Sequence, residues 1–392
     1  MKPLSSTRQW ARLVVSLTLS SMVTGFAPLA PPWSSAGAQF NWAPARAGST
    51  RASPAVFCMS SSTESEIETT EEQEHTELVS VRTQLRPPYL SLKKMYMGDG
   101  EAGANIYPEQ PRGPEVVPIS ASEAARHLSA LTSAAVSQRD PEPGGHYYMP
   151  KGFHLQRLED QAPDAVAAGG EQHGTKLIGT ARARQRDAPH HEATAEAILF
   201  GNEKAIYGAE AQFLAVPAHE LSSTDRVSNV LADKPSRASP HYGANPYTRL
   251  DEAMPLVVDT HHLRHLKAHA RFDSELCQGH FVWEYPALPV AVVWDRGVCA
   301  ALALLRAMGH LGPDGKDRVI VRDLKAATFN LAFAPDLLNL RANLVHSEEG
   351  EPLTDVGGVH SIHKVRVEVT TAEEVELCEM GLQLEVLPAH KS

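Results

Sequence analysis

The chain has 392 residues, of which 42% are hydrophobic and 21% are charged, and its formal net charge is −11. This is enough apolar material for two or three globular cores. The negative charge argues against non-specific binding of nucleic acid, which depends on clustered lysine and arginine. The four cysteines, Cys58, Cys277, Cys299 and Cys378, show no paired spacing. We therefore expect neither a zinc knuckle nor a disulfide framework.

Residues 1–62 have the composition of a targeting sequence. No Asp or Glu occurs before Glu64, and a basic start is followed by an apolar run, residues 13–25, that is too short to span a bilayer. The following stretch, rich in Ser, Ala, Pro and Arg, is typical of transit peptides. This signal-then-transit order, with Phe26 at the junction, resembles the bipartite presequences of algae whose plastids lie inside a membrane derived from the endoplasmic reticulum. It implies a plastid (chloroplast) location, with secretion as the alternative.

Residues 63–77 are acidic and rich in Ser and Thr, and this composition predicts a disordered junction. A first folded unit is expected over residues 78–221. Alternating apolar positions predict a strand within residues 78–92, and the Gly/Pro-rich residues 98–113 are expected to form a loop. Apolar residues at helical spacing predict a helix over residues 119–138, with Ser120 or Ser122 as its N-cap. Four strands are then expected, over residues 146–158, 175–185, 191–200 and 205–216.

Residues 222–254 are polar and rich in Pro, Ser and Asp in their first part, and they are expected to form a linker. A second unit of similar plan is expected over residues 255–388. It begins with strand-like alternation over residues 255–272 and continues with a nearly all-apolar helix over residues 289–308. Four more strands are predicted, over residues 318–329, 338–345, 360–370 and 376–387.

One long helix followed by four strands, found twice, is the element order of a tandem (double) hotdog. In this α+β fold a curled antiparallel sheet wraps around each helix, and an almost wholly apolar helix suits that position.

The second unit carries a string of residues with a recognisable spacing: Gly279-His280-Phe281, then Pro286 and Pro289, then Asp295. It resembles the active-site segment of the β-hydroxydecanoyl type of 3-hydroxyacyl-ACP dehydratases. The resemblance implies a hydro-lyase that forms or hydrates an enoyl thioester. It also implies that His280 and Asp295 are catalytic, and that Gly279, Phe281, Pro289 and Val290 contact the substrate.

Such a reaction needs a group that removes the C2 proton and another that protonates the departing C3 hydroxyl. A histidine that titrates near neutral pH suits the first task. A carboxylic acid at the start of a buried helix suits the second. The backbone N–H groups at that helix start can polarise the thioester carbonyl.

The sequence departs from the dehydratase pattern at two positions. These departures bear on whether the chain catalyses the dehydratase reaction more than on whether it has the fold. Val282 stands where the pattern has proline, and Val290 stands where a glycine normally follows the second proline.

The first unit supplies a second candidate acid. Pro118 followed by Glu123 resembles the first hotdog of the A-factor biosynthesis family, whose halves also carry a helix Glu. Residues 103–118 contain no histidine, so a symmetric second His site is not expected. In paired hotdogs the histidine of one half commonly faces the helix acid of the other, so the resemblance leaves both Glu123 and Asp295 as partners for His280.

Three functions remain open. The first is a 3-hydroxyacyl thioester dehydratase or hydratase, with an acyl-ACP or acyl-CoA substrate. The second is an A-factor-type condensing enzyme, and the third a non-catalytic acyl-binding or scaffold protein, which a tunnel filled by Val290, Trp294 or Phe281 would favour. No cofactor, metal, nucleic acid or membrane span is expected. Arg126 and Arg157 are candidates for contact with an acidic carrier protein, and the chain is expected to be a pseudo-dimeric monomer or a homodimer of such chains.

Overall fold

The described residues begin after the predicted presequence and acidic junction. The computed structural model describes residues 78–83, 85–111, 113–140, 145–158, 177–187, 192–202, 204–217, 245–280, 287–312, 318–334, 336–353 and 358–387. Residues 1–77, most of the predicted linker, and two residues of the dehydratase-like string, Phe281 and Pro286, lie outside this set.

Six strands and one long helix make up the first unit. Its elements are β1 (Lys93–Gly98), β2 (Glu101–Ile106), α3 (Ala121–Ser137), β3 (His146–Arg157), β4 (Leu177–Asp187), β5 (Glu192–Gly201) and β6 (Lys204–Pro217). The second unit begins with two short helical turns, η1 (Pro246–Arg249) and α6 (Leu250–Ala253). Its other elements are β7 (Val257–His262), β8 (His265–Phe272), η2 (Ser274–Cys277), α7 (Val290–Ala307), β9 (Arg318–Thr328), β10 (Asp336–Leu353), β11 (Gly358–Thr371) and β12 (Glu376–Leu387).

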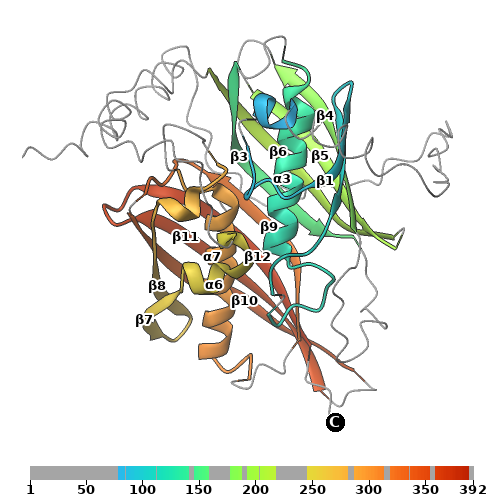
Figure 1. Ribbon diagram of the computed structural model, residues 1–392. Helices are drawn as coiled ribbons and strands as arrows, with labels where there is room; N and C mark the ends of the chain where they lie inside the picture. Colours follow the sequence, from blue (N-terminus) through green and yellow to red (C-terminus); the bar gives the residue numbers. More distant parts are fainter. Residues whose placement is uncertain are drawn as a thin grey trace, which may run out of the picture. The chain divides into compact units, whose positions relative to one another are not determined.

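All twelve named strands belong to one antiparallel sheet (Figure 1). Their order is β1-β2-β4-β5-β6-β3-β9-β12-β11-β10-β8-β7. The second half of this order repeats the first half in reverse, so the two units are related by an approximate two-fold axis at the β3–β9 junction. The register there pairs Gly152 with Ala327 and Gln156 with Asp323.

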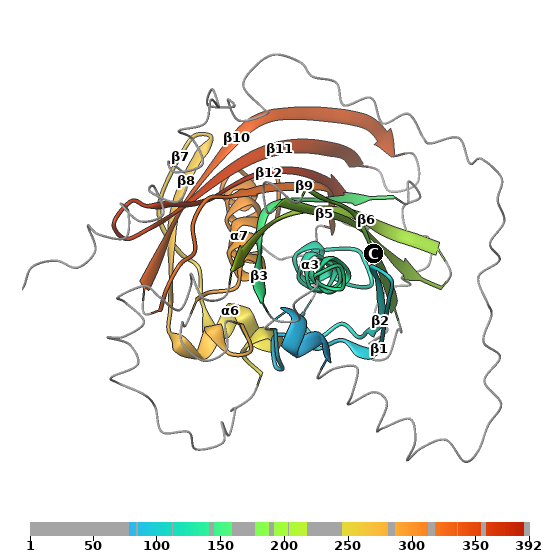
Figure 2. The ribbon, with the colours of Figure 1, turned by 90° about the horizontal axis from the view of Figure 1, so that it is seen from above.

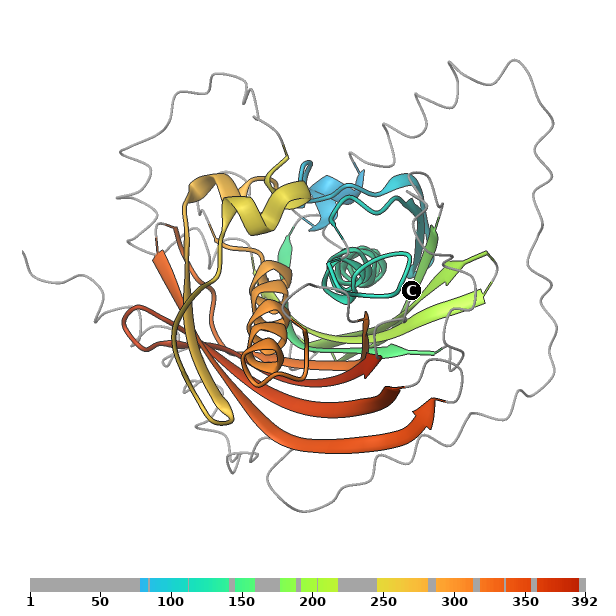
Figure 3. The same cartoon turned by 90° about the horizontal axis from the view of Figure 1, so that it is seen from below.

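The sheet curls around both helices, as Figures 2 and 3 show from opposite sides. All 17 residues of α3 are buried, and 14 of the 18 residues of α7 are buried. Phe153 of β3 stacks on Trp294 of α7, with ring centroids 4.7 Å apart, so apolar packing continues across the junction. The molecule is rich in sheet and has few helices.

Helix α3 has the predicted start. Ser120 is the N-cap, and its hydroxyl accepts a hydrogen bond from the Glu123 amide at 3.3 Å. The Glu115 carboxylate accepts a hydrogen bond from the Ala121 amide at 2.9 Å. A negative charge or a polar oxygen is favourable there, because the first N–H groups of a helix have no partner within the helix.

The predictions for residues 78–113 were wrong. Residues 78–83 are helical, and the expected loop over residues 98–113 contains strand β2. Small residues give β2 its loop-like composition, but they let it pack closely beside α3. A side chain on Gly103 would collide with the Tyr96 ring, which lies 2.0 Å from the position of a Cβ atom.

The described end of the predicted linker packs into the core. Tyr247 and Met254 are fully buried, and Leu250 is almost so. Figures 2 and 3 show α6 and the helical residues 78–83 side by side, across the open side of the curled sheet. The core is therefore closed on that side by segments from both units. Within the described residues, no helix has both the length and the apolar character to cross a membrane.

Candidate active site

His280 follows the short helix η2, in the segment that comes after β8. Asp273 caps the short helix η2 by accepting a hydrogen bond from the Glu275 amide at 2.9 Å. The Tyr247 hydroxyl reaches the carbonyl oxygens of Leu276 at 2.9 Å and Gln278 at 2.7 Å. These contacts fix the backbone of the residues that immediately precede His280.

The imidazole of His280 is neutral, and its tautomer follows from its partners. Nδ1 lies 3.2 Å from the carbonyl oxygen of Ala287, which can only accept, so Nδ1 carries the hydrogen. Nε2 therefore presents its lone pair, and it accepts a hydrogen bond from the Tyr147 hydroxyl at 3.1 Å. Burial lowers the pKa of His280 to about 4, and the Ala287 carbonyl opposes this shift. His280 thus holds an unprotonated basic nitrogen at neutral pH.

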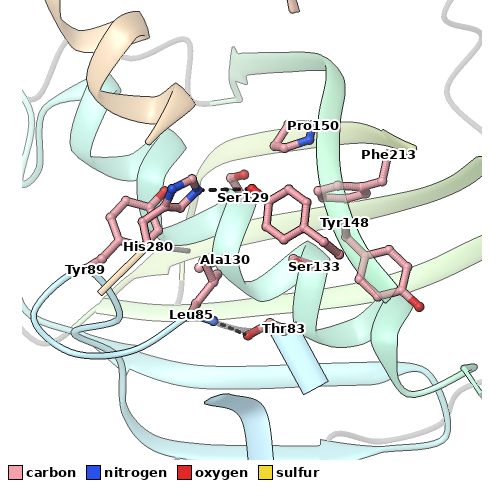
Figure 4. A pocket seen from close by; sticks show the side chains of 11 residues that line it. Thr83, Leu85, Tyr89, Ser129, Ala130, Ser133, Tyr148, Pro150, Phe213 and His280 are labelled. Atoms are coloured by element: carbon pink, nitrogen blue, oxygen red, sulfur yellow. Dashed lines mark hydrogen bonds between the residues drawn. The ribbon is translucent and has the colours of Figure 1, made fainter. Parts of the chain in front are cut away.

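A small, mainly polar cavity adjoins His280 (Figure 4). Its volume is about 20 Å³, which is room for one water molecule. The second unit contributes His280, and the first unit contributes the rest of the lining: Thr83, Leu85, Tyr89, Ser129, Ala130, Ser133, Tyr147, Tyr148, Pro150 and Phe213. The site is therefore shared between the units.

A segment of the first unit, residues 85–90, covers this cavity. Leu85 forms an isolated antiparallel bridge with His280, and the Arg86 amide donates to the Gly279 carbonyl at 2.8 Å. Gly279 has a φ of +76°, and a Cβ atom there would lie 2.2 Å from the Arg86 carbonyl oxygen. Gly279 thus permits the close approach of the covering segment.

Glu123 lies at the start of α3 and faces away from solvent. Its carboxylate accepts from the Glu109 amide at 2.6 Å and lies 3.6 Å from Nε2 of His127. Glu123 and His127 are both buried. Burial and the nearby Arg126 lower the pKa of His127, so the imidazole is neutral. Glu123 is not among the residues that line the His280 cavity.

Asp295 is held by arginine on α7. It accepts from Nε of the adjacent Arg296 at 3.0 Å, and also from an Nη of the same guanidinium. Arg296 further donates to the Met254 carbonyl and to Asp251, both at 2.8 Å. Asp295 is not in the lining of the cavity either. The ring nitrogens of His280 contact Tyr147 and the Ala287 carbonyl, and neither predicted carboxylate hydrogen-bonds to them.

The remaining predicted site residues surround the start of α7. Pro289 is the N-cap position of this helix, and Val290 is its first residue and is buried. Trp294 is fully buried against Phe153. Phe281 lies outside the described residues.

Arg126 and Arg157 are buried, with 2% and 6% of their surface exposed, so they do not form a surface for a carrier protein. Arg126 lies inside a cluster with carboxylates. Its Nη2 is 2.7 Å from Glu109, 3.7 Å from Glu123 and 3.3 Å from Nε2 of His127. These three groups are close enough to hold a metal ion. The guanidinium nitrogen, however, takes the position between them that a metal would need.

The sequence did not indicate that Tyr147 lines the cavity, or that Glu115 and Arg126, which lie outside the lining, are buried. Tyr147 has no motif, because it lies 133 residues from its partner His280. Glu115 follows a Gly-Pro pair and belongs to no recognised motif. Burial raises the pKa of Glu115 to about 8, the Ala121 amide opposes this shift, and Asp295 adds to it. Arg126 lacked any signal that it would be buried.

Glu123 and Asp295 have different positions relative to the N-caps of their helices. Asp295 is the sixth residue after the N-cap Pro289, whereas Glu123 is only the third after the N-cap Ser120. The sixth residue after Ser120 is Arg126. Counted from the N-cap, Arg126 thus has the position in α3 that Asp295 has in α7.

No protein-family model matches this chain. No curated protein matches its sequence.

Among solved structures, a hot dog fold protein from Alicyclobacillus acidocaldarius is similar over 75% of this chain and 96% of its own, with 10% identity and a TM-score of 0.44. An acyl-CoA thioesterase II from Mycobacterium marinum is similar over 76% and 96%, with 11% identity and a TM-score of 0.44. An acyl-ACP thioesterase from Bacteroides thetaiotaomicron is similar over 74% and 100%, with 11% identity and a TM-score of 0.42. The likeness concerns the course of the backbone.

Proposed function

We propose that the two units form a double hotdog that processes an acyl thioester at His280. The observation that carries this proposal is the neutral, buried imidazole whose Nε2 accepts a hydrogen bond from Tyr147, beside a cavity that both units line. Because Nε2 is already unprotonated at neutral pH, the imidazole can act directly as a general base. The preferred reaction is the dehydration of a 3-hydroxyacyl thioester, or the reverse hydration, because the spacing of His280, Pro289 and Asp295 resembles that of the dehydratases.

In this reaction Nε2 of His280 takes the C2 proton, and the electrons of the C2–H bond form the C2–C3 double bond. The C3–O bond breaks, and the departing oxygen takes a proton from the Tyr147 hydroxyl and leaves as water. The His280 imidazolium then returns its proton to Tyr147. Tyr147 lies 3.1 Å from Nε2, within reach for this exchange.

The acyl group needs more room than the cavity offers in this structure. Residues 85–90 form its cover, through the contacts of Leu85 and Arg86 with the His280 backbone. Substrate entry therefore requires this segment to move. Such loop motions are common at enzyme sites that exclude water.

Hydrolysis of the thioester is a second candidate, favoured by one observation. The cavity has room for one water beside His280, and no carboxylate is among its lining residues. His280 would take a proton from that water as its oxygen attacks the thioester carbonyl carbon, and the thiol would leave with a proton. This reaction needs no second acid next to the C3 position.

An assay of the purified protein on acyl-CoA thioesters distinguishes the two reactions. With 3-hydroxybutyryl-CoA and crotonyl-CoA, dehydration or hydration changes the absorbance of the conjugated thioester, whereas hydrolysis releases a thiol that can be titrated. We expect His280→Ala to lower kcat/KM by about 100-fold or more, and Tyr147→Phe by about 10-fold or more.

His261→Ala is the matched control, because His261 is exposed on β7. It should retain full activity. If His280→Ala kept the activity of the unmodified chain, His280 would have no role in the chemistry. If no thioester were turned over, a non-catalytic acyl-binding role would replace this proposal.

The carrier and the location are also proposals. The presequence-like composition of residues 1–62 supports import into a plastid, where acyl carrier protein would present the acyl group. Fusion of residues 1–62 to a fluorescent protein, expressed in an alga with a complex plastid, should direct the fluorescence to that plastid. Fluorescence in the culture medium would point to secretion instead.

A further inference from the structure

Arg126 lies on the same face of α3 as the His280 cavity. Ser129, Ala130 and Ser133 line that cavity, and Figure 4 shows them on the helix beside His280. Arg126 precedes Ser129 by three residues and Ala130 by four, and residues at these spacings are neighbours on one helix face. The guanidinium is thus one turn from the cavity, toward the N-terminus of α3.

A series of aromatic contacts links Arg126 to the His280 ring. The guanidinium carbon lies 5.5 Å from the ring centre of Tyr247, whose hydroxyl holds the backbone just before His280. The ring of Tyr247 lies 5.4 Å from that of Tyr89, and Tyr89 lies 5.3 Å from the His280 ring. Tyr89 belongs to the segment that covers the cavity, so movement of this segment would join the surroundings of Arg126 to the cavity.

Arg126 has unused hydrogen-bonding capacity. Only 2% of its surface is exposed, and its Nη2 lies within hydrogen-bond distance of Glu109 and His127. Within the described part of the chain, its Nε and Nη1 atoms are buried and meet no acceptor. A buried N–H of a charged group without a partner is costly, and such groups often mark a place where a ligand binds.

The charges around Arg126 indicate the kind of ligand. Two carboxylates, Glu109 and Glu123, lie beside one guanidinium, and His127 is neutral. The cluster therefore already carries a net negative charge, and a further anion would be repelled. A neutral oxygen acceptor fits the two open N–H groups better.

We infer that Arg126 binds the carbonyl oxygen of the acyl thioester while His280 acts on the acyl group. The inference rests on the proposed function. Position supports it, because Arg126 is the sixth residue after its helix N-cap, as Asp295 is in the other unit, and because it belongs to one unit while His280 belongs to the other. Arg126 then holds and polarises the thioester carbonyl by donating hydrogen bonds to its neutral oxygen.

A pair of ligands that differ only at this oxygen tests the inference. Butyryl-CoA has the thioester carbonyl, and S-butyl-CoA has a methylene group in its place. Binding of both is measured by calorimetry in the His280→Ala variant, which does not consume the ligand. We expect butyryl-CoA to bind about 10- to 100-fold more tightly, since a hydrogen bond to a charged group favours it.

Arg126→Lys, added to His280→Ala, keeps the charge between the carboxylates but removes the guanidinium donors. We expect the preference for butyryl-CoA to fall to less than about 3-fold, with the affinity for S-butyl-CoA unchanged. Arg157→Lys is the matched control, because Arg157 is also a buried arginine of the first unit. It should keep the full preference. Far-ultraviolet circular dichroism and the melting temperature confirm that each variant is folded.

Three outcomes would overturn the inference. An unchanged preference in Arg126→Lys shows that the guanidinium does not bind the carbonyl, while the thioester function stands. Binding of 3-hydroxybutyryl-CoA is measured in the same variants. If Arg126→Lys loses a preference for this ligand over butyryl-CoA but keeps the preference for butyryl-CoA over S-butyl-CoA, Arg126 binds the C3 hydroxyl and not the carbonyl. Failure of both probes to bind the variant that retains Arg126 removes the proposed function together with the inference.

Discussion

At the scale of single residues, the state of His280 sets the chemistry available to the site. A histidine near neutral pH is usually a mixture of charged and neutral forms. Here burial lowers its pKa to about 4, and the Ala287 carbonyl fixes the hydrogen on Nδ1. The same burial that prepares Nε2 as a base makes the folded protein sensitive to acid, because the unfolded chain binds a proton that the folded chain resists.

The first prediction concerns this sensitivity. The folded pKa of His280 lies below its ordinary value of 6.5, so the unfolded state binds more protons between about pH 6.5 and 4. Stability therefore falls as the pH is lowered through this window and does not depend on His280 above it. Urea unfolding at pH 7 and pH 4 should show that His280→Gln loses less stability than the unmodified chain, by on the order of 3 kcal/mol.

The comparison isolates one histidine. His363 is also buried, burial likewise lowers its pKa to about 4, and its contribution is the same in both proteins. Equal losses of stability in His280→Gln and in the unmodified chain would show that His280 is accessible to protons in the folded state.

At the scale of elements, the covering segment and the His280 connection depend on each other. The backbone of residues 86–89 approaches Gly279 so closely that only a residue without a side chain fits. Its φ of +76° also favours glycine. Gly309, which follows α7, has a similar φ of +78° but has open space around it. A comparison of substitutions at the two glycines therefore distinguishes the effect of backbone strain from that of steric collision.

The second prediction uses this pair. Gly309→Ala should lower the free energy of unfolding by about 1–2 kcal/mol, through backbone strain alone. Gly279→Ala should lower it by about 2 kcal/mol more, because the added methyl group meets the Arg86 carbonyl. Urea unfolding gives both values. Hydrogen exchange at the Arg86 amide, which bonds to Gly279, should accelerate only in Gly279→Ala. Equal effects of the two substitutions would mean that the segment does not lie on Gly279.

At the scale of the whole molecule, the two units share one sheet and one core. Strands β3 and β9 pair across the junction, and His154 of β3 lies 3.1 Å from Asp323 of β9. Beneath them, Phe153 stacks on Trp294 of the other unit's helix. Because the His280 cavity takes its lining from both units, anything that separates the units also takes the site apart.

The third prediction tests this coupling. Phe153→Ala leaves a cavity beside Trp294 and should lower the free energy of unfolding by about 3–5 kcal/mol. Both units should still melt together, in one calorimetric transition whose measured enthalpy equals the van 't Hoff enthalpy. Two separate transitions in the unmodified chain would contradict a shared core. Exposed Phe329, 40% of whose surface is accessible, offers the control Phe329→Ala, which should cost much less.

The elements that local pattern encodes could be predicted without tertiary information. Helices α3 and α7 followed from apolar spacing, from caps and from the Gly/Pro residues at their ends, and eight of the strands followed from alternation. Strand β2 could not be predicted in this way, because its small residues resemble a loop until a neighbouring helix is present to pack against them. The repeat of one helix and four strands indicated the paired architecture.

The sequence by itself determined that His280 follows a strand, precedes a buried helix and belongs to a unit that occurs twice. Only the tertiary structure decided what His280 meets: Tyr147, and the serines of α3 that line the same cavity. The physical reason is distance along the chain. Periodicity and capping depend on contacts within a few residues, whereas the site forms where the paired strands β3 and β9 bring two distant units together.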